Sequence, residues 1–558
     1  MDKVNMFSRV HKLVTSYRGL WINVLLLAYP FLLLSSLVYS GEVRFRSSYD
    51  FVKSAIFNIA FFCSGIFLLA TLRSARIRWM LLKIVFLLQF LLVFVSIYHF
   101  CLYGQFIGSP AVYALLDTNF SESLQFALAY LRLDYLLLAL IAAAPALWSV
   151  IHPVLLPRIQ TENFFHILIP VFFFGLICTA AFSDWRPYLT EHNLLIYLSK
   201  SVNSALKEKD KLEKLYVAPP VLDTKPVLLS DKENKVTHVL VISESINRSH
   251  MSLYGYPRKT NVELERKINQ LYIVKDACSL QNTTVPALKD MLTFATAEHP
   301  QRLYEIPNLI QIMQAAGFET YWLSNQQEVG FYDSFAAIFS KSADHRVFIN
   351  RRGWEEAGSS LDEELVEPFQ DVLKGKPVKK FIVLHLIGAH FHYAWRYPQA
   401  YEVFDNLDDV PREMKRFIQT PDGIKTYNQY DNAILFNDHV VSRLLDSLNE
   451  NEEVTFTYIA DHGEAVGEKG EFFGHAEHLQ YRAINEIPLF FWLSEKSKSH
   501  APEKVDNLRF NLTSPFQSDQ SVHTLLNLYD VHYPLLNYEH SLFSREFTPK
   551  KRHCDDLK

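Results

Sequence analysis

The segment Thr237–Ile242, with the sequence THVLVI, decides the fold, and Ser243-Glu244-Ser245 follows it directly. A short, continuous apolar run is typical of a strand buried on both faces of a parallel sheet. Phe381–Ile387 (FIVLHLI) and Val454–Ile459 (VTFTYI) repeat this pattern later in the chain. The three runs therefore predict three central strands of one sheet.

Shorter apolar runs at 320–323 and 487–492 predict two further strands. Helical patterns such as 306–316 and 430–448 lie between the predicted strands. Strands that alternate with helices favour an α/β domain with a central, mostly parallel sheet.

Polar residues follow each of the three central runs. Glu244 comes after the first, His390 after the second, and Asp461-His462 after the third. Taken singly, they could be a solvated loop residue, a structural histidine and a helix cap. Ligands of open α/β sheets bind beyond the carboxyl ends of the strands, so all four residues are expected at one edge. Carboxylate and imidazole groups without cysteine suit zinc or manganese.

The first third of the chain is rich in apolar residues. Five runs are long enough to cross a bilayer, which takes about 20 residues each, and they lie near 20–39, 51–72, 79–103, 133–153 and 163–183. Buried core helices are the alternative, but five such runs clustered in one region favour membrane spans. We expect a transmembrane domain at 1–190, a charged, amphipathic linker at 191–235 and a catalytic domain at 236–558.

Basic residues set the expected orientation in the membrane. The N-terminal segment and the connection at 73–78 are rich in lysine and arginine, whereas the connection at 104–132 carries only Arg132. The positive-inside rule places the first two in the cytoplasm, although the loop near residues 40–53 also carries basic residues. An odd number of spans then places residues 184–558 outside the cytoplasm.

Composition excludes some functions. The net charge is −5, and no basic stripe with interleaved aromatic residues is present, so we expect no nucleic-acid partner. Cys278 and Cys554 are the only two cysteines of the second half, and their spacing does not show whether they pair. A domain of roughly 300 residues buries a sufficient core, so neither is expected to be needed for folding.

Five blocks of sequence carry a resemblance to a known family. They are VISESINRSHMSLYGYPRKTN (241–261), NTTVPALKDMLTFA (282–295), LHLIGAHFHYAWRYP (384–398), YDNAILFND (430–438) and DHGEAVGEKG (461–470). In order and spacing the chain resembles the bacterial lipopolysaccharide phosphoethanolamine transferases of the alkaline phosphatase and sulfatase superfamily. The SNQQ and LTFA sequences resemble the branch that modifies the inner core. The resemblance implies five spans in the bacterial inner membrane and a periplasmic, alkaline-phosphatase-like catalytic domain.

The resemblance also implies roles for individual residues. Glu244, Asp461 and His462 match the zinc ligands of the family, and Thr284 matches the nucleophile, which also touches the metal. The neighbouring Thr283 stays an alternative because the setting Asn282-Thr283-Thr284 differs from that of the best-known members. A helix N-cap is the structural alternative for Thr284.

Four further residues are candidates for binding the substrate. By resemblance, His390 and His475 hold the phosphate or a second metal ion, and His478 competes with His475. Asn325 and Gln326, after the strand at 320–323, could hold the phosphate or the ethanolamine, or could simply form a polar turn.

The implied activity is transfer of phosphoethanolamine from phosphatidylethanolamine to lipopolysaccharide through a phosphothreonine intermediate. Neither the acceptor atom nor the number of metal ions and subunits follows from the sequence. The rivals are a phosphodiesterase of the same fold and a transferase that uses glycerol phosphate or acts on a glucan. A catalytically inactive, lipid-binding scaffold is a rival from another class. The presence of Glu244, Thr284, Asp461 and His462 argues against the scaffold.

Overall fold

The computed structural model describes residues 18–39, 48–103, 131–152, 194–217, 224–229, 235–296, 298–326, 339–350, 360–468, 472–475 and 481–557, with a few single residues between them. Contacts divide the chain into two compact units. The first comprises residues 1–116 and 130–208, and the second comprises residues 117–129 and 209–558. The predicted domain boundaries at 190 and 235 stay predictions.

The first unit is helical. Its long helices are α2 (Arg18–Tyr39), α3 (Ser48–Thr71), α4 (Ala75–Tyr103), α7 (Leu133–Ile151) and α10 (Leu194–Val217), whose residues after 208 belong to the second unit. Among the described residues, two segments are long and apolar enough to cross a membrane, Ala75–Leu102 and Leu133–Ile151. They correspond to the predicted third and fourth spans. Helices α2 and α3 coincide with the predicted first and second spans, whose crossing of a membrane stays a prediction, and the fifth lies outside the described residues except for one position.

Helices α2 and α4 are joined by a polar contact that a proline makes necessary. Pro30 has no N–H to donate to the carbonyl of Leu26, four residues before it in α2. The side-chain amide of Gln89, from α4, donates to Leu26 O at 3.2 Å and to Leu27 O at 3.0 Å. A carbonyl that is freed inside an apolar bundle is thus satisfied by a neighbouring helix.

The second unit is built on an eight-stranded sheet. Its strands, in spatial order, are β11 (Phe516–Gln517), β3 (Leu271–Cys278), β10 (Glu486–Leu493), β7 (Glu453–Ala460), β2 (Val236–Ser243), β6 (Lys380–His385), β4 (Glu319–Ser324) and β5 (His345–Phe348). Only β10 runs antiparallel to its two neighbours. The prediction of a mostly parallel central sheet is confirmed.

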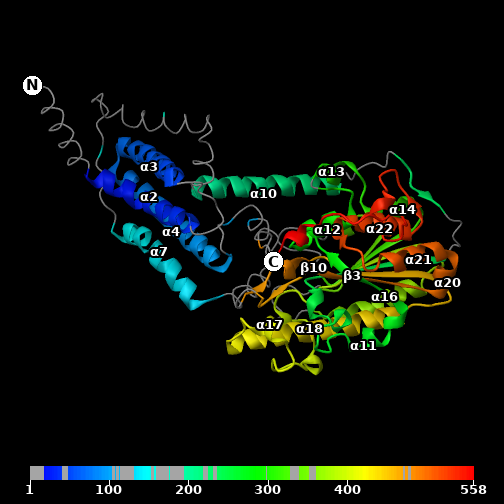
Figure 1. Ribbon diagram of the computed structural model, residues 1–558. Helices are drawn as coiled ribbons and strands as arrows, with labels where there is room; N and C mark the ends of the chain where they lie inside the picture. Colours follow the sequence, from blue (N-terminus) through cyan, green and yellow to red (C-terminus); the bar gives the residue numbers. More distant parts are fainter. Residues whose placement is uncertain are drawn as a thin grey trace, which may run out of the picture. The chain divides into compact units, whose positions relative to one another are not determined.

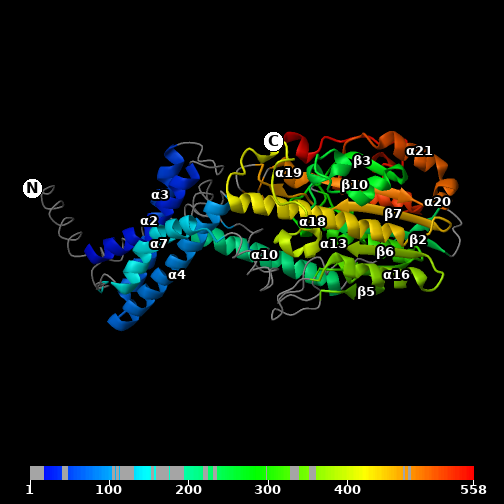
Figure 2. The same cartoon turned by 90° about the horizontal axis from the view of Figure 1, so that it is seen from below.

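Helices cover both faces of this sheet (Figure 1). On one face lie α12 (Thr284–Leu292), α14 (Leu309–Ala315) and α22 (Ser521–Leu528), and on the other lie α11 (Val262–Arg266), α16 (Val366–Lys374) and α18 (Pro421–Asp446). Figure 2 shows α18 lying along the sheet beside α16. Every residue of β2, β6 and β7 is buried, which explains their continuous apolar runs.

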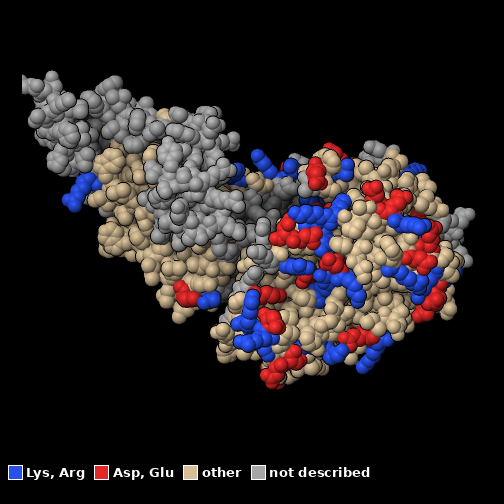
Figure 3. Space-filling model, in the orientation of Figure 1, with Lys and Arg blue, Asp and Glu red and all other residues tan. Residues whose placement is uncertain are grey.

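Charged side chains distinguish the surfaces of the two units. On the face drawn in Figure 3, lysine, arginine, aspartate and glutamate are interspersed over the second unit, with no large area of one sign. The described surface of the first unit shows few charged side chains in that view. This distribution agrees with the absence of a basic stripe in the sequence.

The end of the chain is fastened to the sheet. Cys278, the last residue of β3, forms a disulfide with Cys554, a pairing that the sequence left open. The guanidinium of Arg552 adds bonds to Asp276 on the same strand, at 2.9 Å to its carbonyl and 2.8 Å to its carboxylate. The last residues are therefore part of the second unit's packing.

Candidate metal centre

The predicted strand ends meet at one edge of the sheet. Strand β2 lies between β7 and β6, with Ser243 beside Ala460. Glu244 follows β2, and Asp461 and His462 follow β7, so the three side chains start from adjacent strands. All three are buried, and one ligand atom from each lies within 4.8 Å of the others.

A glycine turn brings the end of β6 close to Glu244. Gly388 has a φ of 55°, and a Cβ placed there would lie 2.4 Å from the carbonyl oxygen of Glu244. Only glycine fits such a close approach. The next residue, Ala389, donates its N–H to the same carbonyl at 3.0 Å. His390 follows, with its Nε2 3.3 Å from Glu244 Oε1.

The orientation of His462 leaves one nitrogen for a ligand. Its Nδ1 lies 2.8 Å from the carbonyl oxygen of Gly463 and must donate to it. Burial is the main cause that lowers the pKa of His462, so the ring is neutral and Nε2 carries a lone pair. That nitrogen lies 3.5 Å from Asp461 Oδ2, a buried oxygen that receives no hydrogen bond within the described part of the chain. Two electron-rich atoms face each other, as two ligands of one cation do.

Thr284 presents its hydroxyl to these ligands. It is the first residue of α12, and its Oγ1 lies 3.0 Å from Glu244 Oε1 and 3.4 Å from His462 Nε2. The N-cap position belongs to Thr283, whose side chain makes no capping bond. The N-cap alternative for Thr284 is therefore wrong.

The donor set fits zinc. Two carboxylates, one imidazole whose other nitrogen is bonded to a backbone carbonyl, and one hydroxyl converge on a buried point, and zinc favours such ligands. The unshared electron pairs of Asp461 and His462 indicate where the ion would be held.

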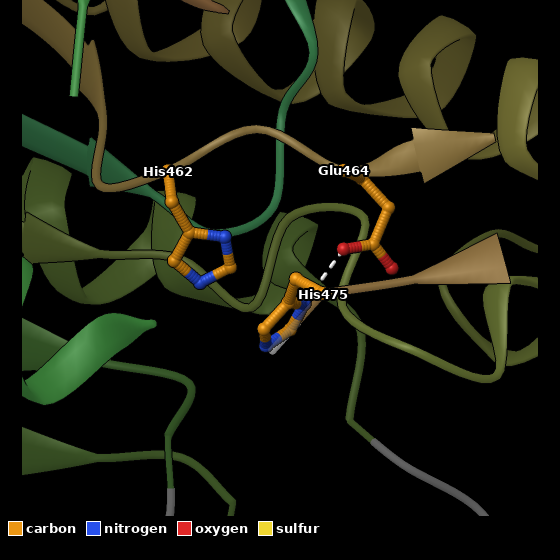
Figure 4. A group of neighbouring side chains, drawn as sticks. All are labelled: His462, Glu464 and His475. Carbon is orange, nitrogen blue, oxygen red and sulfur yellow. Dashed lines mark hydrogen bonds and ion pairs between the residues drawn. The ribbon is translucent and has the colours of Figure 1, made fainter. Parts of the chain in front are cut away.

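A second candidate metal-binding group shares His462 with the first and is drawn in Figure 4. His462, Glu464 and His475 point toward one another and also form a cluster able to hold a metal ion. Glu464 accepts a hydrogen bond from the hydroxyl of Tyr393 at 2.6 Å, and its other oxygen lies 2.6 Å from His475 Nδ1. Burial raises the pKa of Glu464 to about 8 and lowers that of His475 to about 4. This pair is therefore electrically neutral at neutral pH.

Sequence reasoning missed Glu464 as a member of the site. Its signal is its place two residues after His462 in the extended segment that leads into β8 (Ala465–Val466). His475 lies directly after the partner strand β9 (Phe473–Gly474), which pairs antiparallel with β8. The small hairpin thus brings together two residues that are eleven positions apart. His478, the competitor of His475, lies outside the described residues.

The two amide candidates, Asn325 and Gln326, have different hydrogen-bond partners. Gln326 donates from its side chain to Glu244 Oε2 and so belongs to the site. Asn325 is fully buried and bonds to Ser360 O at 3.0 Å and to Asp362 Oδ1 at 2.8 Å. Asp362 also accepts the N–H of Gly388 at 2.9 Å, so Asn325 supports the glycine turn from behind, and its role as a substrate ligand stays a prediction.

Comparisons with known proteins agree with this arrangement. Residues 237–531 match the Sulfatase family. The chain is 28% identical over 483 residues to Phosphoethanolamine transferase EptC of Escherichia coli (strain K12), an alignment that covers 81% of this chain and 80% of the relative. It is 27% identical over 486 residues to Phosphoethanolamine transferase CptA of Salmonella typhimurium, with the same coverage.

Solved structures are similar as well. The crystal structure of the C-terminal periplasmic domain of EcEptC in complex with Zn is 30% identical, with a TM-score of 0.55, and the match covers 60% of this chain and 92% of that one. The integral membrane protein lipooligosaccharide phosphoethanolamine transferase A from Neisseria meningitidis is 18% identical, with a TM-score of 0.66 over 94% of this chain and 97% of that one. The second likeness concerns the fold alone. The chain belongs to the sulfatase family and, within it, to the phosphoethanolamine transferases.

Proposed function

We propose that this enzyme transfers phosphoethanolamine from phosphatidylethanolamine to lipopolysaccharide at the periplasmic face of a bacterial inner membrane. The names of the relatives support the transferred group. The similarity to the periplasmic domain of EcEptC and the two long apolar helices of the first unit support the setting. One observation carries the mechanism: the hydroxyl of Thr284 lies within 3.4 Å of both Glu244 Oε1 and His462 Nε2.

Two displacements account for the reaction. In the first, Thr284 Oγ1 attacks the phosphorus of phosphatidylethanolamine, the bond to the diacylglycerol oxygen breaks, and that oxygen takes up the proton that the Thr284 hydroxyl loses. In the second, a hydroxyl or phosphate oxygen of the acceptor attacks the same phosphorus. The bond to Thr284 then breaks, and its hydroxyl is restored by the proton that the acceptor loses.

Glu244, Asp461, His462 and Thr284 would hold one zinc ion. When bound, zinc lowers the pKa of a coordinated hydroxyl and offsets the charge of the phosphoryl group. Side chains of the protein supply the other catalytic functions. Burial holds the pKa of His390 well below its ordinary value and that of His475 at about 4, so both imidazoles are neutral and can accept protons or donate hydrogen bonds to phosphoryl oxygens. Gln326 lies beside Glu244 and could orient the ethanolamine phosphate.

A phosphodiesterase of the same fold is the second candidate, and it differs only in the acceptor, because water would then attack the phosphothreonine. A transferase acting on a glucan, or one that uses glycerol phosphate, would differ in acceptor or donor. The site geometry is compatible with each. The names of the relatives favour phosphoethanolamine as the transferred group, and lipopolysaccharide as the acceptor is our proposal.

Trapping the intermediate tests the proposal. The full-length protein should be incubated with phosphatidylethanolamine and no acceptor, and its mass should increase by one phosphoethanolamine. Peptide mapping should place the added mass on Thr284, and adding lipopolysaccharide should remove it. An adduct on Thr283, or continued transfer by a Thr284→Ala protein, would contradict the mechanism. Rapid loss of the adduct in water without acceptor would indicate the phosphodiesterase.

A further inference from the structure

Glu244 is followed by an unusual backbone conformation. Ser245 has a φ of 59°, in the left-handed region that non-glycine residues rarely occupy. Its hydroxyl is fully buried and has no hydrogen-bond partner within the described part of the chain. The side chain of Ser245 therefore does not stabilise the turn that aims Glu244, and another group must hold it.

The hydroxyl of Tyr430, on helix α18, contacts both sides of this turn. It donates to the carbonyl of Ser245 at 2.8 Å and accepts the N–H of Asn247 at 2.8 Å. Tyr430 is fully buried, and burial raises its pKa well above the ordinary value, so the hydroxyl keeps the proton it donates. The N–H of Ser245 in turn donates to Asp461 Oδ1 at 3.2 Å. The turn thus links two of the proposed metal ligands.

The ring of Tyr430 contacts the other half of the site. It packs edge-on against Tyr393, with ring centroids 5.0 Å apart and an angle of 78° between the planes. The hydroxyl of Tyr393 donates to Glu464, and Glu464 is paired with His475. One buried tyrosine therefore touches both the turn behind Glu244 and the tyrosine that orients Glu464.

We propose that Tyr430 is a positioning residue that holds the side-chain carboxyl groups of Glu244 and Glu464 in place at the metal centre. It acts through the Ser245 turn and through Tyr393. The inference rests on the proposed function, because it takes Glu244 to be a metal ligand. It also gives a role to the segment 430–438, which the sequence singled out without assigning one.

Zinc affinity of the full-length protein is the first test, measured by competition with a chromophoric chelator. Tyr430→Phe keeps the ring and removes only the hydroxyl, so the fold should survive. Loss of a group that orients a metal ligand typically lowers affinity by about 10- to 100-fold, and we expect a loss in that range. The turnover number should fall, while the KM for phosphatidylethanolamine should change little.

Tyr427→Phe is the matched control. Tyr427 is also fully buried on α18, and its hydroxyl pairs with that of Tyr256 at 3.0 Å rather than with the Ser245 turn. The Tyr427→Phe variant should lose about as much thermal stability as Tyr430→Phe, and its zinc affinity should stay unchanged. Equal zinc losses in both variants would show a general packing effect and would overturn the inference, as would wild-type affinity in Tyr430→Phe.

A second variant tests the route through Ser245. Glycine adopts a positive φ readily, so Ser245→Gly should lessen the need for the tyrosine hydroxyl. In that background Tyr430→Phe should cost much less zinc affinity than it does in the wild type, a coupling expected of residues that act through one another. Strictly additive losses would overturn the inference. If the zinc results hold but the wild type transfers no phosphoethanolamine, the proposed function fails and the positioning role stands.

Discussion

His462 Nε2 and Asp461 Oδ2 lie 3.5 Å apart, and the oxygen has no hydrogen-bond partner within the described part of the chain. The Nδ1–H of His462 donates to Gly463 O, and Asp461 Oδ2 accepts no hydrogen bond among the described residues. A lone pair facing a carboxylate is unfavourable in a buried place unless a cation lies between the two atoms. Without a cation the protein therefore carries a local cost at this pair, which a bound metal ion would remove.

Asp461→Asn should separate metal binding from folding. The amide can donate to His462 Nε2, so the metal-free variant should be more stable than the metal-free wild type, by about 1–3 kcal/mol for one satisfied buried group. Zinc affinity should fall steeply, because one charged ligand is lost. Urea unfolding and metal analysis of a fragment spanning residues 224–558 would measure both. A variant that is less stable without metal would argue that Asp461 is stabilised by something other than a cation.

The transfer rate should depend far more on Thr284 than on its neighbour Thr283. Thr284→Ala removes the proposed nucleophile and should lower the transfer rate by ~10⁴-fold or more, as for other covalent nucleophiles. Zinc should stay largely bound, because Glu244, Asp461 and His462 remain. Thr284→Ser should retain measurable activity, since the hydroxyl survives. Thr283→Ala, at a position with no capping bond, should change the rate little. Rates would be followed by mass spectrometry of the modified glycolipid.

Asp290, on α12, should make stability depend on pH. Burial is the main cause that raises its pKa from 3.8 to about 6. The folded protein therefore keeps a proton that the unfolded chain releases, so this stabilisation is complete below about pH 4 and is lost as the pH rises through 6. At about 1.4 kcal/mol per pKa unit, the loss is about 3 kcal/mol.

Asp290→Asn removes this titration and can keep the bond from Gln281, which lies 2.6 Å from Asp290 Oδ2. Between pH 4 and pH 7, the stability of the variant relative to the wild type should therefore rise by about 3 kcal/mol. Chemical unfolding of the 224–558 fragment at several pH values would measure the difference. A constant difference would show that Asp290 ionises normally in the folded state.

The disulfide should stabilise the second unit without being required for it. Cys278 and Cys554 are 276 residues apart, and a disulfide that closes a long loop contributes typically about 2–4 kcal/mol by restricting the unfolded chain. Replacing both cysteines with serine should lower the free energy of unfolding by that amount. The seven other strands of the sheet should persist, and so should zinc binding. Complete loss of folding would show that the core depends on the cross-link.

The sequence predicted the parts of the site that lie directly after buried strands. Glu244, Asp461 and His462 follow continuous apolar runs, and parallel strands bring such positions to one edge. Glu464 was missed because its role depends on the hairpin that returns His475 to it, a tertiary contact without a periodic signal. The surroundings of Asn325 were not foreseen, because a polar residue after a strand can face inward, as its bonds to Ser360 and Asp362 show.

Strand direction could not be read from the sequence either. Residues 487–492 were expected as a strand, and they form β10, but this strand runs against its neighbours. A buried antiparallel strand has the same apolar run as a parallel one, so composition does not distinguish them. Strand β3 was not expected, because Lys275 and Asp276 interrupt its apolar pattern and lie exposed or half-buried near its end.

The pairing of β2 with β7 has a consequence for how the chain acquires its structure. Paired residues of these two strands, such as His238 and Thr455, are 217 positions apart. Contacts between such distant segments form slowly, because a long loop must close first. During synthesis β2, with eight residues that are all destined for burial, emerges long before its two partners, β6 and β7, exist. The nascent chain thus exposes an aggregation-prone strand throughout that interval, and its yield in cells should depend on chaperones that shield β2 until residue 460 has been made.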